Sequence, residues 1–384
     1  MTTRVRRLRR WGIGAGLAFV GLAGLLLAWL AVLFRGPALA PQPVPGGLVD
    51  LHCHTAGLGH GGSGCFVSPE LAANFRFGIY LQAFGVTREE LQQHGDQLVV
   101  DRLAARLAES GGVARAVVLA LDGPVTDAGE LATNRTEVHV PNEFLAAAVA
   151  RHTNLLWGAS INPLRHDALA RLDWAATHGA VLVKWLPAIM DFDPGDPRLR
   201  PFYERLAALR MPLLCHTGAE NSFTRADHRF GDPLRLRLAL ECGVTVIAAH
   251  VAGGSQTDGE EDFLRLRRLM EEFPNLYADT SALTQVNRPG HLRRVLADPL
   301  VRERLVYGSD FPLSNTALVS PWYFPRDLSP AEMARLDDVK NPWDRDVALK
   351  AALGMPPETF TRGARLLRLP AGIPAESLAK LSPP

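Results

Sequence analysis

Two histidines in the segment Asp50-Leu-His52-Cys-His54 have the residue type and the spacing of a metal-binding pair. The apolar segment around them is expected to be a β-strand, and side chains two positions apart on a strand point the same way. Both imidazoles would therefore face one space, and neutral imidazoles are good ligands for Zn²⁺ and related divalent ions. This motif is weak evidence by itself, because paired strand histidines are also often structural.

Further side chains capable of chemistry end other apolar segments. His216 ends Leu213–His216, His250 ends Val246–His250, and Asp310 follows Val306-Tyr-Gly-Ser. If these segments are strands of a barrel, all of these groups reach the carboxyl-terminal mouth, where barrel enzymes have their active sites. The chain has 12 histidines, and the eight outside this pattern are interpreted as surface residues: His60, His94, His139, His152, His166, His178, His228 and His291.

Lys184 lies inside the apolar segment Val181–Trp185 of a chain that contains 37 arginines and only 4 lysines. A buried ammonium group is unfavourable without a partner. A desolvated amine can react, for example with CO₂ to form a carbamate that bridges two metal ions. The alternative is a salt bridge to Asp310 or to a substrate carboxylate, and both interpretations remain open here.

The elements that would position these residues alternate along the chain. Eight short β-branched or apolar segments predict strands at Leu48–His52, Arg115–Leu121, Leu155–Ile161, Ala180–Leu186, Pro212–Thr217, Val244–His250, Leu276–Thr280 and Arg304–Tyr307. Amphipathic helical patterns lie between most of them, at Leu98–Leu107, Glu143–Ala150, Ala168–Thr177, Leu199–Leu209 and Phe263–Phe273. This alternation predicts an α/β fold with eight parallel strands, a (β/α)₈ TIM-like barrel over residues 48–369. An open doubly wound sheet is the alternative.

A long insert, from Thr55 to about Gly85, interrupts the alternation directly after the first strand. It contains Gly57-Leu-Gly59-His-Gly61-Gly62, which formally matches GxGxxG. A dinucleotide site requires a helix to open at once, whereas the next helix signal is Ser68-Pro69-Glu70. We therefore predict a mobile loop and reject a nucleotide site.

The amino-terminal region predicts a membrane anchor. Five arginines in the first ten residues precede 24 uncharged residues from Trp11 to Phe34, enough to cross a bilayer. The positive-inside rule keeps the basic tip cytoplasmic, so residues 1–35 would be a tip and transmembrane helix, with the catalytic domain extracytoplasmic. Residues 36–47 form a Pro/Gly-rich linker and residues 370–384 a tail. A cleaved signal peptide with Ala38-Leu-Ala40 is the alternative.

Net charge and cysteine content give weaker constraints. The formal charge of +1 gives no reason to expect nucleic-acid binding. Cys53, Cys65, Cys215 and Cys242 are interpreted as small free thiols rather than a disulfide framework.

Together, the Asp50–His54 motif, Lys184, His216-Thr-Gly218, His250 and Gly308-Ser-Asp310 resemble the amidohydrolase superfamily. The stretches VKWLPAIMDFDPGDP, LLCHTG and VYGSDFP most resemble the amidohydrolase-related branch that includes aminocarboxymuconate semialdehyde decarboxylase. The similarity runs from about Leu48 to Leu367, and its motifs are specific for the metal site but not for the substrate.

The resemblance implies one divalent metal ion held by His52, His54, His216 and Asp310, with His250 activating water or polarising the substrate. In binuclear relatives a carbamylated lysine stands where Lys184 falls, and the sixth-strand histidine becomes a ligand. We expect one ion, Zn²⁺, and keep two ions with carbamylated Lys184 as the alternative.

These residues predict a hydrolase that cleaves an amide, ester or lactone bond of a small carboxylic substrate with a metal-activated water. Asp310 would accept the water proton, and His250 would orient the water or stabilise the oxyanion. A decarboxylase acting on an aromatic or unsaturated acid is the alternative, which a carboxylate-binding arginine such as Arg225 would favour. A non-catalytic, membrane-displayed binding protein is a third possibility, although no ligand position is missing. Ser309 lacks the GxSxG context of a nucleophile.

Overall fold

The computed structural model of the chain describes residues 19–25, 27, 46–288 and 290–369. Its centre is a ring of eight short parallel strands. In chain order they are β1 (Leu48–His54), β3 (Val113–Leu119), β5 (Leu155–Gly158), β6 (Val183–Trp185), β7 (Leu213–His216), β8 (Val246–Ala249), β11 (Leu276–Asp279) and β12 (Leu305–Val306). Every one falls within or overlaps a predicted strand.

Backbone hydrogen bonds close this ring. One sheet has the order β1-β3-β5 and the other β12-β11-β8-β7-β6. Single parallel bridges join them, between Ala159 and Val183 on one side and between Cys53 and Phe311 on the other. The second seam also has His54 N donating to the Phe311 carbonyl at 2.7 Å. The closed parallel barrel is therefore confirmed, and the open sheet is wrong.

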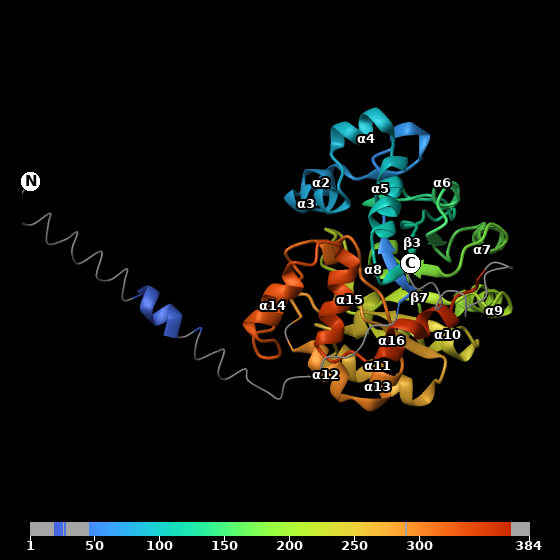
Figure 1. Cartoon of the computed structure of the whole chain (residues 1–384). Coiled ribbons are helices and arrows are strands. Elements are labelled where there is room, and N and C mark those ends of the chain that lie inside the picture. Colours follow the sequence, from blue (N-terminus) through green and yellow to red (C-terminus); the bar gives the residue numbers. More distant parts are fainter. Residues whose placement is uncertain (1–18, 26, 28–45, 289, 370–384) are drawn as a thin grey trace, which may run out of the picture.

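Helices surround the barrel (Figure 1), most of them in the segments between successive strands and the last three after β12. They are α5 (Gln97–Ala108), α6 (Asn142–Val149), α7 (Ala168–Thr177), α8 (Pro187–Met190), α9 (Arg200–Ala208), α10 (Arg237–Glu241), α11 (Asp262–Glu272), α12 (His291–Ala297), α13 (Pro299–Glu303), α14 (Pro330–Asp337), α15 (Pro342–Ala352) and α16 (Pro357–Arg362). The large apolar core lies between these helices and the strands. A separate cluster with members from most strands fills the barrel interior.

The insert after β1 is not the predicted loop. It contains β2 (Phe66–Val67), α2 (Pro69–Ala73) and α3 (Phe75–Phe84), and α4 (Arg88–His94) follows it. Ser68 caps α2 by accepting a hydrogen bond from Leu71 N, as the Ser68-Pro69-Glu70 signal indicates. Buried Phe77, Leu81 and Phe84 hold α3 against the core. The prediction missed α3 because it gave the glycines more weight than this apolar spacing.

The glycine-rich part of the insert is organised by a carboxylate of the chain itself. Asp96 is fully buried and accepts hydrogen bonds from Leu58 N at 2.9 Å and from Gly59 N at 2.8 Å. Because Asp96 occupies these amides, they cannot cradle a phosphate. This contact agrees with the rejection of a nucleotide site.

Most of the predicted anchor lies outside the described residues, as do linker residues 36–45 and the tail 370–384. Residues 19–25 and 27 are described and are helical. Among the described residues, no helix combines the length and the hydropathy needed to span a membrane. All four cysteines are free thiols, as predicted.

Candidate metal centre

The two histidines of β1 meet at the carboxyl end of the strand, where the strand is also irregular. Leu51 packs in the barrel interior, whereas Cys53, two positions later, packs in the outer core. The register with β3 shifts between Asp50 and Cys53, which breaks the simple alternation. His52 Nε2 and His54 Nε2 then lie 3.1 Å apart.

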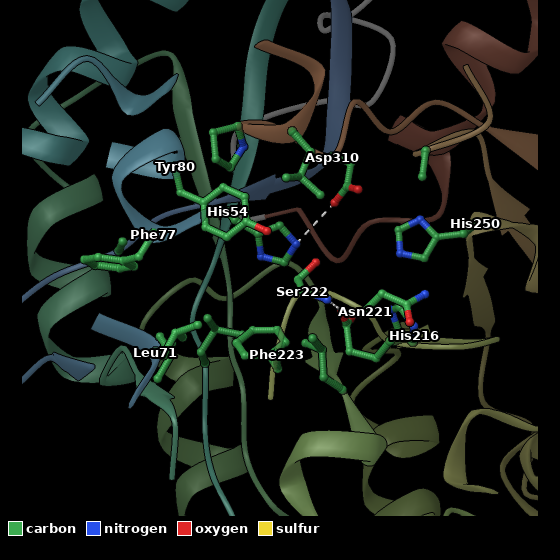
Figure 2. A pocket seen from close by; sticks show the side chains of 18 of the residues that line it. His54, Leu71, Phe77, Tyr80, His216, Asn221, Ser222, Phe223, His250 and Asp310 are labelled. Atoms are coloured by element: carbon green, nitrogen blue, oxygen red, sulfur yellow. Dashed lines mark hydrogen bonds and ion pairs between the residues drawn. The ribbon is translucent and has the colours of Figure 1, made fainter. Parts of the chain in front are cut away.

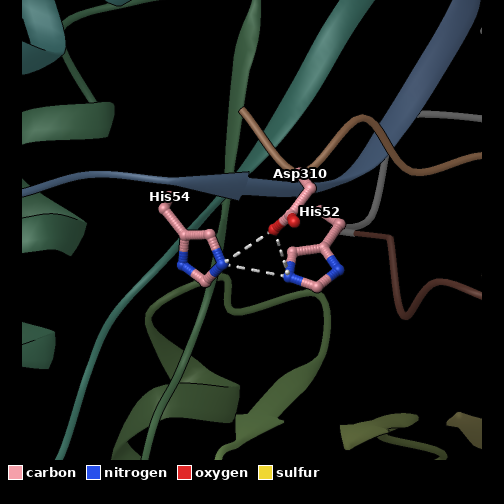
Figure 3. A group of neighbouring side chains, drawn as sticks. All are labelled: His52, His54 and Asp310. Atoms are coloured by element: carbon pink, nitrogen blue, oxygen red, sulfur yellow. Dashed lines mark hydrogen bonds and ion pairs between the residues drawn. The ribbon is translucent and has the colours of Figure 1, made fainter. Parts of the chain in front are cut away.

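Asp310 completes a compact group with this pair (Figure 3). Its Oδ1 lies 3.4 Å from His54 Nε2 and 3.6 Å from His52 Nε2. The backbone is fixed as well, because Asp310 N donates to the His52 carbonyl at 2.9 Å and Asp310 has a left-handed φ of 59°. Two ring nitrogens and one carboxylate oxygen thus converge at the seam that closes the barrel.

Ser309, next to Asp310, has a structural contact rather than a nucleophilic one. Its Oγ donates to the Asp50 carboxylate at 2.5 Å, and its backbone N donates to the same carboxylate at 2.9 Å. The serine is 3% exposed. These contacts tie the first strand to the segment that carries Asp310.

Asp279 at the end of β11 was missed by the sequence analysis, although it lies within the predicted strand Leu276–Thr280. It is fully buried, and its Oδ2 accepts a hydrogen bond from His52 Nδ1 at 2.7 Å. Its Oδ1 accepts from His250 N at 2.9 Å and from the Ser281 hydroxyl. The carboxylate therefore orients His52 so that the Nε2 lone pair faces His54 and Asp310.

The same network assigns the tautomer of His250. Ser281 has one hydroxyl proton, which it donates to Asp279, so Ser281 Oγ must accept from His250 Nδ1 at 2.8 Å. Nε2 of His250 is consequently an acceptor facing the pocket. The ring is held by a strained turn, since His250, Val251 and Ala252 all have left-handed φ values of 62°, 51° and 48°. Such strain, especially at a β-branched residue, is typical of functional sites.

His216 at the end of β7 lies beside His250, with ring centroids 4.9 Å apart, and the His250 centroid is 5.3 Å from that of His52. His216 Nδ1 is 3.3 Å from Glu220 Oε2. Its Nε2 is buried without a hydrogen-bond partner among the described residues. An orphaned ring nitrogen facing this group is the kind of atom that a metal ion would satisfy.

Burial keeps three of these imidazoles neutral. It lowers the pKa of His216 to about 4 and the pKa of His250 well below its usual value. The pKa of His52 is lowered too, by burial and by the charge of Lys184. Burial alone would raise the pKa of Asp310, but contact with His54 and the other histidines holds it well below its ordinary value. Neutral imidazoles and an ionised carboxylate form a donor set suited to a divalent cation.

Lys184 is fully buried, and its Nζ lies 3.1 Å from His52 Nε2. Within the described part of the chain no carboxylate is within 4.0 Å of this amine, so the predicted salt bridge to Asp310 is not formed. Burial lowers the pKa of the Lys184 ammonium group. The amine therefore lies directly beside the His52 nitrogen that faces His54 and Asp310.

A cavity of about 140 Å³ opens onto these groups (Figure 2). His54, His216, His250 and Asp310 line one end, and an apolar end opposite is lined by Leu71, Phe77 and Phe223 among others. This polarity gradient fits a small molecule with one reactive polar end and one apolar end.

The arginine of the pocket is Arg288, and the prediction of Arg225 is wrong. Arg225 lies outside the cavity lining and pairs with Glu70 at 3.3 Å. Arg288 lines the cavity, and its Nη1 donates to the Gly253 carbonyl at 2.7 Å. Arg288 follows the seventh strand by nine residues, a position with no motif to mark it.

Of the histidines interpreted as surface residues, His291 is buried and His139 is largely covered. His291 is 9% exposed, and burial lowers its pKa to about 4. The side chain of His139 is 15% exposed and lies 3.8 Å from Asp122. Both predictions failed because tertiary packing covers loops and helix starts whose sequence gives no sign of it.

The sequence profile of the family described as amidohydrolase matches residues 49–336. The chain belongs to the amidohydrolase family. This membership agrees with the closed barrel and with the convergence of His52, His54 and Asp310 at its mouth. An amidohydrolase of this kind is an enzyme that depends on a divalent metal ion. A comparison with curated proteins finds no match.

Solved structures of low sequence identity match the chain over most of its length. An uncharacterised TIM-barrel protein from Bordetella bronchiseptica is 16% identical, covering 79% of this chain and 99% of that one, with a TM-score of 0.49. A 2-pyrone-4,6-dicarboxylic acid hydrolase, so named provisionally, from Pseudomonas putida is 17% identical over 80% and 97%, with a TM-score of 0.40. A dihydroxybenzoic acid decarboxylase from Polaromonas with bound manganese is 14% identical over 80% and 97%, with a TM-score of 0.44. Since these TM-scores are below 0.5, we take the fold from the strand pairing itself.

Proposed function

We propose that this amidohydrolase cleaves an amide, ester or lactone bond of a small carboxylic substrate with a metal-activated water. The proposed ligands are His52, His54, His216 and Asp310, and the proposed ion is Zn²⁺. One observation carries the proposal: His52 and His216 each have Nδ1 against a carboxylate, which turns both Nε2 atoms towards the buried site. His216 Nε2 has no hydrogen-bond partner among the described residues, and His52 Nε2 lies beside His54 and Lys184. Such carboxylate–histidine contacts are typical of metal ligands.

A divalent ion in this site acts as a Lewis acid and lowers the pKa of bound water towards neutrality. The chain's own groups then have distinct roles. Asp310, ionised and beside His54, accepts the proton of the attacking water and later returns it to the leaving group. His250 accepts a hydrogen bond through Nε2 and so orients the water. In this tautomer His250 Nε2 cannot donate a hydrogen bond to an oxyanion. Of the two predicted roles of His250, orienting the water is therefore favoured over stabilising the oxyanion.

Lys184 leaves the metal count open to experiment. Burial lowers the pKa of Lys184, and the uncharged form of this amine can attack CO₂ to form a carbamate with loss of a proton. Such a carbamate would provide a ligand for a second ion. We propose one ion as the resting state. Metal analysis in the presence and absence of bicarbonate tests this. Two equivalents of metal per chain that appear only with bicarbonate, and a second equivalent that is lost in Lys184→Met, would support the binuclear alternative.

A decarboxylase is the second candidate, and Arg288 is the observation that favours it. A guanidinium in the cavity provides a bidentate partner for a substrate carboxylate. Assaying a panel of carboxylic esters, lactones and aromatic acids for proton release and for CO₂ release separates the two reactions. CO₂ release without hydrolysis would replace our proposal.

Asp310→Asn tests the hydrolytic mechanism directly. An amide cannot accept the water proton, so we expect at least a hundredfold loss of kcat for a general base with an unchanged circular dichroism spectrum. Wild-type turnover in Asp310→Asn would exclude Asp310 as the base. Asp227→Asn, at an exposed ion pair with Arg229, is the matched control.

We also propose that the sequence from Trp11 to Phe34 anchors the enzyme in a membrane with its barrel extracytoplasmic. β1 begins at Leu48, directly after the sequence of the predicted linker, and His54 and Asp310 stand at the opposite, carboxyl end of this strand. An anchored enzyme would thus turn its mouth away from the bilayer and towards soluble substrates. Sequencing the amino terminus of the mature protein tests this, because cleavage after Ala40 would remove the anchor.

A further inference from the structure

Glu137 is a buried acid that contacts both walls of the cavity without lining it. It lies just before β4 (Val138–His139) and is 4% exposed. Its carboxylate accepts hydrogen bonds from Thr224 N at 2.9 Å, from Arg225 N at 3.0 Å and from the Thr224 hydroxyl. Its backbone carbonyl accepts from Ser68 N at 2.7 Å. One residue thus connects the insert after β1 with the loop after β7.

Each connection positions part of the apolar end of the cavity. On the insert side, Ser68 is the amino-terminal cap of α2, and Leu71 of that helix lines the cavity. On the other side, Phe223 lines the cavity one residue before Thr224. Figure 2 shows Leu71 and Phe223 at the end of the pocket away from His250. Holding the backbone of Thr224 therefore holds the ring of Phe223.

Two other contacts between this loop and the rest of the chain are weaker than the Glu137 contact. Arg225 pairs with Glu70 at 3.3 Å, but their side chains are 43% and 55% exposed. Ion pairs of this exposure contribute little. Arg76 donates to the Asn221 carbonyl at 2.8 Å, also at the surface. The contact of the buried Glu137 carboxylate with its three donors is stronger than either of these surface contacts, because its hydrogen bonds are charge-assisted and shielded from water.

We propose that Glu137 is a positioning residue that fixes Phe223 over the apolar end of the cavity. The enzyme would thereby select carboxylic substrates that carry a compact apolar group, either an aromatic ring or a branched hydrocarbon. Without the Glu137 contact, Phe223 can swing out and water enters the apolar end. The inference rests on the proposed function for its choice of substrate class. The role of Glu137 is to discriminate between ligands, and it does not depend on which bond the enzyme breaks.

The test compares benzoate with acetate as probes of the zinc-loaded, full-length chain by isothermal titration calorimetry. Both carry the same carboxylate, so the ratio of their dissociation constants reports the apolar end alone. We expect the wild type to bind benzoate at least tenfold more tightly than acetate. Glu137→Gln keeps the size of the side chain, but its NH₂ group cannot accept hydrogen bonds from the backbone N–H groups of Thr224 and Arg225. We therefore expect this substitution to lower the ratio of the two dissociation constants roughly tenfold.

Phe223→Ala and Glu70→Gln complete the design. Phe223→Ala should lower the ratio by a similar factor, and the double variant with Glu137→Gln should lower it no further, because both act through the same ring. Glu70→Gln removes only the exposed ion pair of the same loop and should keep the wild-type ratio. Trypsin should cleave after Arg225 faster in Glu137→Gln than in the wild type or in Phe223→Ala.

An unchanged ratio with unchanged cleavage in Glu137→Gln would overturn the inference, as would an equal loss of acetate and benzoate binding. So would a wild type that binds both probes alike. If Glu137→Gln does not fold, Thr224→Val removes the hydroxyl donor alone and must lower the ratio in the same direction. A wild type that hydrolyses nothing would refute the proposed function, yet it would leave these binding ratios valid.

Discussion

At the scale of single residues, the site depends on how Asp279 distributes its hydrogen bonds. One oxygen accepts from His52 Nδ1, and the other accepts from His250 N and the Ser281 hydroxyl. The carboxylate is ionised, since burial would raise its pKa but the histidines hold it below its usual value. A single side chain thus fixes the tautomers of both a proposed ligand and the proposed water-orienting residue.

Asp279→Asn should therefore weaken metal binding. The amide keeps the volume but offers only one acceptor oxygen, so the orientation of His52 or of His250 is lost. We expect zinc affinity roughly tenfold to a hundredfold lower, as for other partners of metal-bound histidines, measured by competition with a chromogenic chelator. Asp191→Asn, whose carboxylate pairs with Arg135 at the surface, is the control. Equal zinc affinity in Asp279→Asn would contradict this role.

At the scale of elements, the proposed site is built at the junction of β12 and β1. Gly308, two residues after β12, passes close to β1, because a Cβ atom at position 308 would lie 2.9 Å from His52 Cβ. The Gly308 carbonyl is held by the Lys350 ammonium group at 2.9 Å and by Thr280 Oγ1 at 3.2 Å. These hydrogen bonds hold the backbone at Gly308 in place, so only glycine allows it to lie this close to His52.

Gly308→Ala should push His52 out of place. We expect a loss of unfolding free energy of about 1–3 kcal/mol, the usual effect of overpacking, together with weaker zinc binding, measured by urea unfolding and by metal titration. Gly111→Ala is the control, because its Cβ would meet nothing closer than a carboxylate oxygen of Asp344 at 3.9 Å. Wild-type zinc affinity in Gly308→Ala would show that the strand adjusts.

At the scale of the whole molecule, α15 supports the barrel from outside with a buried ion pair. Lys350 is fully buried, and its Nζ lies 2.7 Å from Asp346 and also donates to the Gly308 carbonyl. Tyr307 donates its hydroxyl to the same aspartate at 3.1 Å. This cluster connects a helix near the end of the described chain to the strand that closes the ring.

Lys350→Met should destabilise the protein by about 3 kcal/mol or more, because it leaves a buried carboxylate uncompensated. Adding Asp346→Leu should restore part of this free energy of unfolding, since no charge then remains buried. Urea unfolding monitored by tryptophan fluorescence measures both. Lys340→Met, at a side chain that is 86% exposed, should have no effect, and an equally small effect at Lys350 would contradict the argument.

The sequence by itself determined the order of strands and helices and the residues at the strand ends. Alternating and helical apolar periodicities are local, so they locate the eight barrel strands and five of the outer helices (α5, α6, α7, α9 and α11) within a few residues. The positions of His52, His54 and Asp310 follow, because parallel strands in a barrel end on one face.

Only the tertiary structure decided which groups complete the site. Asp279, Arg288 and Glu137 act across the barrel, and no local pattern distinguishes them from other polar residues near strand ends. The tautomers of His52 and His250 depend on hydrogen bonds over 227 and 31 residues of sequence. Burial and hydrogen bonding between distant segments arise only when the ring closes, which is why spacing along the chain predicted the framework of the centre but not its supporting contacts.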